Sequence, residues 1–410
     1  MNLDTLIAKF REHLWLPDPT PLLIMLAAVV ANHLPGDPVW VLLVGPPSSG
    51  KTELLSALST LDGIYEVSTF TKAGLLSGSL SNRPDATGGL LAEIGAFGII
   101  VGKDFTSLLS ESSETRAGVF AALREIYDGQ WSRRVGTAGG TNLAWRGKVG
   151  LLAATTETID RHVSAIGAMG ERFVFCRMPT LDEHDRLAQA RAALTVGGTE
   201  PAARAALADA VHAFLTPHLN RKAVVVGLEI DLDWLVRLAD LATRCRSVVE
   251  RDARDRQVEL VPQPEAAARL AKVLAQLGRG LQIIGVAPDK VSAILRTVAL
   301  DALPKTRRAV IDVIVNTRPG SELTAADVAD RIGLPTDVTA RALDDLAAHA
   351  IVRRESGPGQ PHRWGPTDWL RNRWEYLFSS MSTPQLMTDI DDVAETEGTG
   401  YMEPLDDDIF

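Results

Sequence analysis

The stretch Val39-Trp-Val-Leu-Leu-Val-Gly-Pro-Pro-Ser-Ser-Gly-Lys-Thr52 decides the fold. It opens with an unbroken apolar run to Val44, which is typical of a parallel strand buried on both faces of a sheet. The pattern Gly-x-x-x-x-Gly-Lys-Thr comes next, and Thr52 to Leu61 can form a helix. A strand, a glycine-containing loop and a helix in this order predict a phosphate-binding loop. The alternative is a chance match in an ordinary turn.

Such a loop binds ATP through its backbone N–H groups, which can surround a β-phosphate. The loop residues expected to do so are Gly45, Pro46, Pro47, Ser48, Ser49 and Gly50. Lys51 supplies a positive charge at the β- and γ-phosphate oxygens, and the Thr52 hydroxyl is suited to hold Mg²⁺. ATP and Mg²⁺ are therefore the expected cofactors.

The bulk composition fits a cytoplasmic protein of two or three domains, since the chain has 410 residues. The two cysteines, Cys176 and Cys245, form no CxxC pair, which excludes a disulfide framework and indicates a reducing compartment. The longest apolar run, Pro21 to Ala31, is too short to span a bilayer. We expect a buried helix there and no membrane partner.

The formal charge of −10 comes from the C-terminal end. After residue 380 the chain has nine acids and no Lys or Arg, so removing them from the total of 52 leaves 43 acids against 42 bases. The nearly neutral body is compatible with a nucleic-acid partner. The acidic tail, residues 379–410, is expected to be disordered.

The predicted organisation is an α/β core with helical additions. Apolar strands at 39–44, 96–101 and 149–154 alternate with helical patterns such as 115–127, which predicts a layered parallel sheet. A hairpin is expected at 131–147. We assign 1–37 to an N-terminal helical segment, 38–180 to the ATP-binding core and 181–302 to a helical lid in which 233–254 is one helix.

Residues 303–378 predict a winged helix-turn-helix. Helical patterns at 307–316, 324–332 and 337–349 precede two short strands, 351–355 and 362–364, joined by a Gly/Pro turn. The expected recognition helix carries more acids than bases. The predicted wing is better placed to attract DNA phosphates, because it carries Arg353, Arg354 and Arg363. Duplex DNA binding and protein docking both remain open for this domain.

Three further residues are suited to catalysis. Asp104 ends the second strand, where a P-loop ATPase needs a carboxylate for the metal or the attacking water, although Asp104 also suits a helix cap. Thr155, with Thr156 beside it, ends the third strand and can orient water. Arg172 precedes an apolar strand and is either a surface ion-pair partner or an arginine finger that reaches a neighbouring subunit's nucleotide.

The order of these motifs resembles the minichromosome-maintenance (MCM) helicases, which are AAA+ ATPases. The resemblance is carried by Gly98-Ile-Ile-Val-Gly-Lys-Asp-Phe105, the 131–147 hairpin, Leu151-Leu-Ala-Ala-Thr-Thr156 and Gly170-Glu-Arg-Phe173. It implies an insert at 69–89, a water-orienting role for Thr155, a trans-acting finger at Arg172 and a lid-borne phosphate sensor at Arg269. Two departures are Lys103, where these helicases have a metal-binding aspartate, and the absence of their DNA-binding region from residues 1–37.

The resemblance also implies a hexameric ring whose hairpins grip single-stranded DNA in a central pore. Trp131, Arg133 and Arg134 could supply stacking and phosphate contacts there, unless the hairpin is only structural. The last residues, Asp406-Asp-Asp-Ile-Phe410, resemble the acidic tip of bacterial single-stranded-DNA-binding proteins and suggest a docking peptide for a protein partner. A solubilising tail is the alternative.

The expected function is therefore an ATP-driven replicative motor, of the kind that bacterial mobile elements carry. Two other functions fit the same motifs. One is an ATP-switched winged-helix DNA-binding regulator, and the other is a MoxR-like ATPase that remodels proteins. Stimulation of ATP turnover by single-stranded DNA separates the motor from both.

Overall fold

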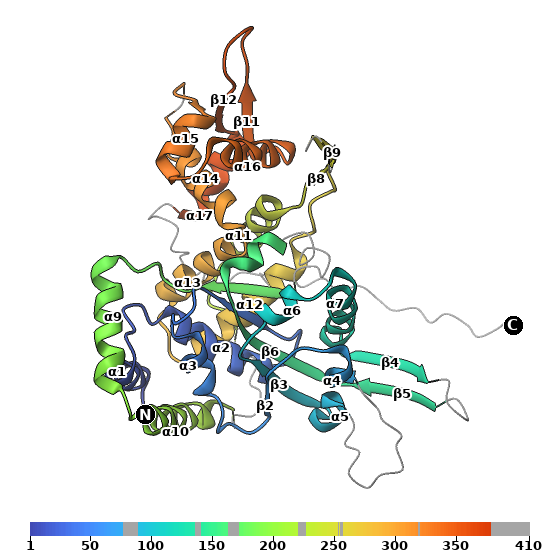
Figure 1. Ribbon diagram of the computed structural model, residues 1–410, viewed down its shortest axis with the longest axis vertical. Helices are drawn as coiled ribbons and strands as arrows, with labels where there is room; N and C mark the ends of the chain where they lie inside the picture. The colour runs from blue at the N-terminus through green and yellow to red at the C-terminus, as the bar shows by residue number, and fades with distance from the viewer. Residues whose placement is uncertain are drawn as a thin grey trace, which may run out of the picture.

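The chain is a mixed α/β protein built around a five-stranded parallel sheet (Figure 1). The computed structural model describes residues 1–76, 89–135, 141–162, 172–219, 227–252, 254, 257–318 and 320–378. The strands lie in the spatial order β2 (Ile64–Val67), β3 (Phe97–Gly102), β6 (Lys148–Thr155), β1 (Trp40–Val44) and β7 (Phe173–Arg177). The three strands expected from apolar runs are confirmed as β1, β3 and β6.

Parallel pairing brings the carboxyl ends of all five strands to one edge of the sheet. β6 lies between β1 and β3, with Val44 opposite Thr155, and β7 flanks β1 on its other side, with Val44 opposite Arg177. The loop after β1 therefore has the ends of β6 and β7 as immediate neighbours. Residues that precede β6 and β7 lie at the opposite, amino edge.

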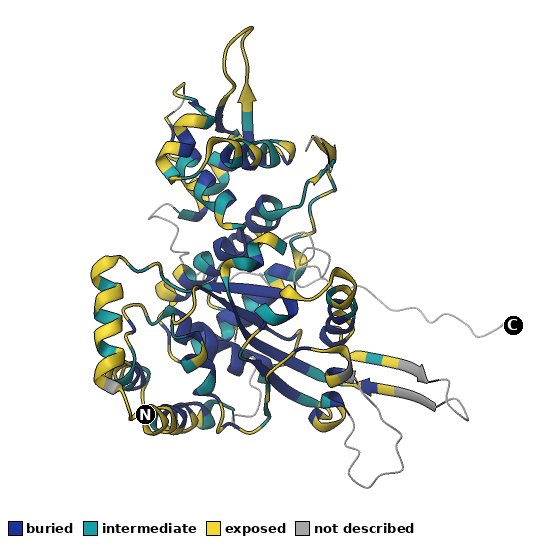
Figure 2. Cartoon of the chain, viewed as in Figure 1, coloured by how far each residue is buried: buried dark blue, intermediate teal, exposed yellow. Residues whose placement is uncertain are grey.

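Alternate residues of β1 face two separate apolar cores, as the strand period of two requires. Val41 and Leu43 pack with α1 (Leu3–His13), α2 (Thr20–His33) and α12 (Ala268–Ile283). Trp40 and Leu42 pack on the other face with α7 (Ser113–Tyr127). Figure 2 shows the strands as the buried centre of the molecule.

The first helix expected after the loop is shorter than predicted. It is α3 (Lys51–Ser56), because residues 57–61 form i→i+3 hydrogen bonds before Gly63, which has a left-handed backbone.

The expected buried helix at 21–31 is confirmed, since every residue from Pro21 to Ala31 in α2 is buried. In the described part of the chain, no helix has both the length and the apolar character needed to cross a membrane.

The predicted hairpin is present as β4 (Gln130–Val135) and β5 (Thr141–Arg146), which project from the body (Figure 1). Its turn, residues 136–140, lies outside the described residues. The same holds for residues 77–88 of the expected insert, whose flanks form the short helices α4 (Lys72–Leu76) and α5 (Leu90–Ile94). α6 (Thr106–Ser110) follows β3, and the 3₁₀ helix η1 (Glu157–His162) follows β6.

The helical region after β7 contains α9 (Glu183–Val196), α10 (Glu200–Leu219), α11 (Leu232–Arg246) and α13 (Pro288–Asp301). The prediction of one helix over 233–254 was wrong beyond Arg246. Ser247 adopts an extended conformation (ψ 138°), and the chain then forms the antiparallel pair β8 (Glu250–Arg251) and β9 (Val258–Leu260). Two consecutive β-branched residues, Val248 and Val249, favour that change.

The last described region is a small module at the far end of the molecule (Figure 1). It consists of α14 (Lys305–Val315), α15 (Ala325–Ile332), α16 (Thr336–Ala348) and a three-stranded sheet, with α17 (Asp368–Phe378) after it. The strand order is β10 (Leu323–Thr324), β12 (Arg363–Pro366), β11 (Val352–Glu355), and β10 was not predicted. The acidic tail, with its Asp406–Phe410 tip, lies outside the described residues.

Candidate functional site

The loop that the sequence predicts to bind phosphate has a sharply turned backbone. Ser48 and Gly50 have φ of 61° and 85°, in the left-handed region that a side chain disfavours. Gly45 lies so close to the chain after β7 that an added Cβ would meet the Met178 side chain at 2.8 Å. The backbone N–H of Gly45 donates to Thr155 O at 3.2 Å, which joins the loop to β6.

Lys51 folds back over this loop and is only 8% exposed. Its ammonium donates to Gly45 O at 2.8 Å, Pro46 O at 2.6 Å and Ser49 Oγ at 3.0 Å. Burial lowers the pKa of Lys51, and the nearby Glu157 carboxylate opposes that lowering. A buried ammonium held by carbonyl oxygens is positioned to exchange them for phosphate oxygens, which bind it more strongly.

A cavity of about 480 Å³ opens over the loop, a volume within the usual range for ligand sites. Residues 48–54 form its polar side. Met178, Pro179 and Leu181 come from the chain after β7, and Gln189, Ala192 and Ala193 come from α9. Of the predicted residues, the cavity brings together Ser48, Ser49, Gly50, Lys51 and Thr52.

Sequence reasoning missed the wall opposite the loop. Residues 13–18, between α1 and α2, line the same cavity with apolar side chains that include Leu14, Trp15, Leu16 and Pro17. An aromatic and aliphatic wall beside a polar phosphate loop is suited to a nucleobase. The only local signal was the helix break at Pro17–Pro19, which predicts a turn and says nothing about which cavity the turn lines.

Asp104 acts as a helix cap in this structure. Its Oδ1 accepts the N–H of Thr106 at 2.9 Å and that of Ser107 at 3.3 Å, at the start of α6. It does not line the cavity over the loop. Lys103 forms an ion pair with Glu66 at 2.6 Å, and both line a separate cavity that Thr52 borders.

The Thr155 hydroxyl lies in a buried cluster of threonines. It is 3.3 Å from the Thr106 hydroxyl, which also accepts the N–H of Thr156 at 3.0 Å. Thr156 Oγ1 in turn lies 2.7 Å from Thr158 Oγ1. The structure thus joins the ends of β3 and β6 through hydroxyl groups beside the loop.

Arg172 and Arg269 lie at the opposite, amino edge of the sheet. Arg172 precedes β7, is 7% exposed, and makes two hydrogen bonds to the Asp128 carboxylate at 2.9 and 3.0 Å. Its guanidinium also lies over the Tyr127 ring. Arg269 pairs with Glu265 at 3.2 Å and lines a second cavity with Tyr127 and Asp128. A strand of this length spans roughly 15 Å, so neither arginine is near the loop of its own chain.

Lys148 and Lys272 also line this second cavity, which therefore carries several cations. The Lys148 ammonium donates to Leu34 O at 2.6 Å, and burial lowers its pKa to about 8 while Asp37 opposes the shift.

The residues proposed for DNA contact lie on two elements. Trp131 is half-buried on β4 opposite Trp145, and Arg133 and Arg134 follow on the same strand, with side chains outside the described part. On the C-terminal module the wing arginines have partners within the chain. Arg353 pairs with Glu322 and Glu355, Arg354 pairs with Asp344, and Arg363 donates to Glu322 O.

The predicted recognition helix, α16, is partly docked on the helical region. Its Asp345 pairs with Arg251 at 2.6 Å and with the buried Arg307 at 3.0 Å. His349, which follows α16, accepts a hydrogen bond from Arg244 through its carbonyl. Only part of this helix is therefore open to a ligand.

Comparison with known protein families and with curated proteins gives no match. Among solved structures, the chain is similar to the C-terminal region of NrS-1 in its apo form, with 10% identity over 88% of this chain and 75% of that one. The TM-score is 0.22, so this similarity carries no argument about fold or function.

Proposed function

We propose that this chain is an AAA+ ATPase of the MCM-like type that couples ATP hydrolysis to movement along DNA. The observation that carries the proposal is the buried Lys51 ammonium, held by three oxygens of a Gly-x-x-x-x-Gly-Lys-Thr loop, at the floor of a nucleotide-sized cavity. The loop and its lysine suit the phosphates of ATP, and the apolar wall suits the base.

Mg²⁺ would be held by the Thr52 hydroxyl, because Thr52 lines the cavity beside Lys51 and hard cations prefer oxygen ligands. Asp104 is a weaker candidate, since its Oδ1 already accepts two backbone N–H groups. When bound, the ion would neutralise charge on the phosphate oxygens.

The position of Arg172 and Arg269 supports the proposal of a ring, most simply a hexamer. Both lie at the amino edge of the sheet, and the loop lies at the carboxyl edge. If either arginine acts on ATP, it would act on the nucleotide of a neighbouring subunit. The projecting hairpin with Trp131, Arg133 and Arg134 supports a single-stranded DNA path through such a ring.

We infer that the C-terminal module is a winged helix-turn-helix, a proposal supported by its three helices and the antiparallel pair β11–β12. One observation favours a second function, a protein-remodelling ATPase: Arg353 and Arg354 already pair with carboxylates, which leaves less positive charge for duplex DNA. The other alternative, an ATP-switched DNA-binding regulator, needs this same surface to bind its operator DNA.

Calorimetry with ATP tests the nucleotide site. Lys51→Ala removes at least two charge-assisted hydrogen bonds, worth about 1.5–3 kcal/mol each, so we expect ATP affinity to fall by about 100-fold or more. Lys290→Ala, an exposed lysine on α13, is the matched control and should bind as the parent does. Equal affinity of all three proteins would end the assignment of the loop.

A further inference from the structure

In the described part of the chain, two carboxylates line the cavity over the loop, and each already has a partner: Glu53 pairs with Arg204, and Asp18 accepts the N–H of Thr20. Asp104 was the predicted residue, but its carboxylate caps α6 by accepting the N–H groups of Thr106 and Ser107. Lys103 occupies the position before it. If the chain is the proposed ATPase, on which this inference rests, another carboxylate serves this role.

Glu157 is the first residue of η1, just after the strand next to the loop. It follows β6 by two residues, and Thr155 at the end of that strand pairs with Val44 and accepts the Gly45 N–H. The side chain is 49% exposed, so water can reach it. Its charge also acts on Lys51, where it offsets the effect of burial on the ammonium. The pairing of Val44 with Thr155 places Glu157 two residues beyond the strand end that adjoins the loop.

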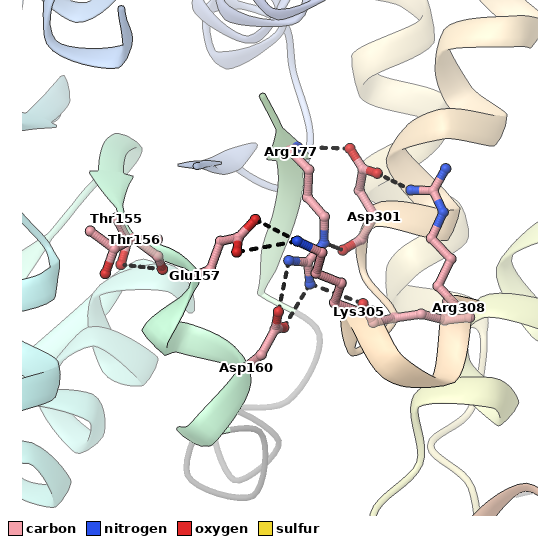
Figure 3. Close-up of polar contacts among 9 residues, drawn as sticks. Thr155, Thr156, Glu157, Asp160, Arg177, Asp301, Lys305 and Arg308 are labelled. Atoms are coloured by element: carbon pink, nitrogen blue, oxygen red, sulfur yellow. Dashed lines mark hydrogen bonds and ion pairs between the residues drawn. The ribbon is translucent and has the colours of Figure 1, made fainter. Parts of the chain in front are cut away.

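A lysine of the C-terminal module holds this carboxylate in the present conformation. Lys305, the first residue of α14, contacts both Glu157 oxygens at 3.0 and 3.2 Å (Figure 3). Both side chains are about half exposed, and an exposed pair of this kind is worth only about 0–1 kcal/mol. The contact can break without much cost to folding.

The residues around Lys305 are anchored far more firmly. Arg308 pairs with Asp301, and Asp301 accepts the backbone N–H of Arg177 at 2.7 Å at the end of β7. Arg177 also makes two hydrogen bonds to Asp160 of η1, as Figure 3 shows. The start of α14 is thus fixed beside the loop, and Lys305 is its exposed and exchangeable contact.

We propose that Glu157 is the general base of this ATPase and that Lys305 withholds it until the ion pair opens. Glu157 would take a proton from a water molecule as the water oxygen attacks the γ-phosphorus. The bond from that phosphorus to the β,γ-bridging oxygen breaks, ADP leaves with the electron pair, and the proton passes later to solvent. The Thr155 hydroxyl is suited to orient the same water.

The test uses the full chain with ATP and Mg²⁺, and compares Glu157→Gln with Lys305→Met. Loss of a general base lowers turnover about 10²- to 10⁴-fold, so we expect that loss for Glu157→Gln with ATP affinity unchanged. Lys305→Met should hydrolyse ATP at least as fast as the parent. Glu355→Gln, which breaks a comparably exposed pair with Arg353, should leave turnover unchanged.

A purely structural ion pair predicts a different pattern, in which Glu157→Gln and Lys305→Met have equal and small effects. That result, or turnover of Glu157→Gln within about threefold of the parent, would overturn the assignment of Glu157 while the ATPase stands, because the expected loss is about 10²-fold or more. A parent protein that binds no ATP would overturn the proposed function itself and this inference with it.

Discussion

Gly45 and Thr155 are joined by a backbone hydrogen bond of 3.2 Å across β1 and β6. The first residue of the phosphate-binding loop is thereby fixed to the strand end that carries the threonine cluster and Glu157. The two arginines suited to act on phosphate lie at the other edge of the same sheet, which separates the binding half of the proposed site from its activating half.

Arg172 is predicted to act across a subunit interface. Arg172→Ala should lower ATP turnover about 10³-fold or more, as loss of an arginine finger does, without weakening ATP binding. Mixing it with Lys51→Ala creates interfaces where an intact loop faces an intact Arg172, so some turnover should return. Asp128→Asn is the control for the ion pair between Arg172 and Asp128. If mixing restores nothing although mixed rings form, Arg172 has only the structural role of its contact with Asp128.

The hairpin is predicted to bind the DNA backbone. Replacing Arg133 and Arg134 by alanine should weaken single-strand binding and lower the slope of log K against log salt by about 0.7 for each lost phosphate contact. Anisotropy titrations at several salt concentrations measure this slope. A Lys9→Ala, Lys290→Ala double variant removes the same charge on α1 and α13, away from the hairpin. Equal slopes for both variants would identify the hairpin as structural.

Lys148 is predicted to give stability an unusual pH dependence. Burial lowers its pKa to about 8 in the folded protein, while the unfolded chain keeps the ordinary value near 10.4. The unfolded state therefore binds more protons between these values, so folded-state stability rises with pH in this window. Thermal unfolding of the parent and of Lys148→Met, from about pH 7.5 to 10, should show the parent gaining relative to the variant. A constant difference would mean that Lys148 titrates normally.

The C-terminal tip is predicted to dock a protein or to restrain DNA binding. Deleting Ile409 and Phe410 removes the apolar pair that would fill a pocket, while Asp406 to Asp408 remain to attract a basic surface. We expect loss of binding to proteins that recognise the acidic tip of bacterial single-stranded-DNA-binding proteins, or a gain in DNA affinity, with ATP affinity unchanged. If neither changes, the tip is a solvated tail.

The sequence predicted the parts of the fold that local patterns determine. Val39–Val44 and Val149–Ala154 are continuous apolar runs, and both are central strands. β2 was missed because its residues are half-exposed at the sheet edge and lack such a run. The β8–β9 pair was missed because apolar residues continue at helical spacing past Arg246 in the sequence.

The site was predictable only where one segment contains it. Lys51 and its oxygen partners lie within a few residues of one another, so the motif sufficed. Contacts between residues far apart in the sequence could not be predicted from it. Examples are Arg172 with Asp128, 44 positions apart, and Lys305 with Glu157, 148 positions apart. The cap made by Asp104 is local, since it accepts the N–H groups of Thr106 and Ser107, and the sequence already offered it as the alternative to a catalytic role.

The most direct test of the account is ATP turnover by the full chain with and without single-stranded DNA. We predict Mg²⁺-dependent hydrolysis that DNA stimulates, that Lys51→Ala abolishes, and that Lys290→Ala retains. An equal rate of ATP hydrolysis with and without single-stranded DNA would contradict a DNA motor and favour the protein-remodelling function. Absence of ATP binding and hydrolysis would contradict the account as a whole.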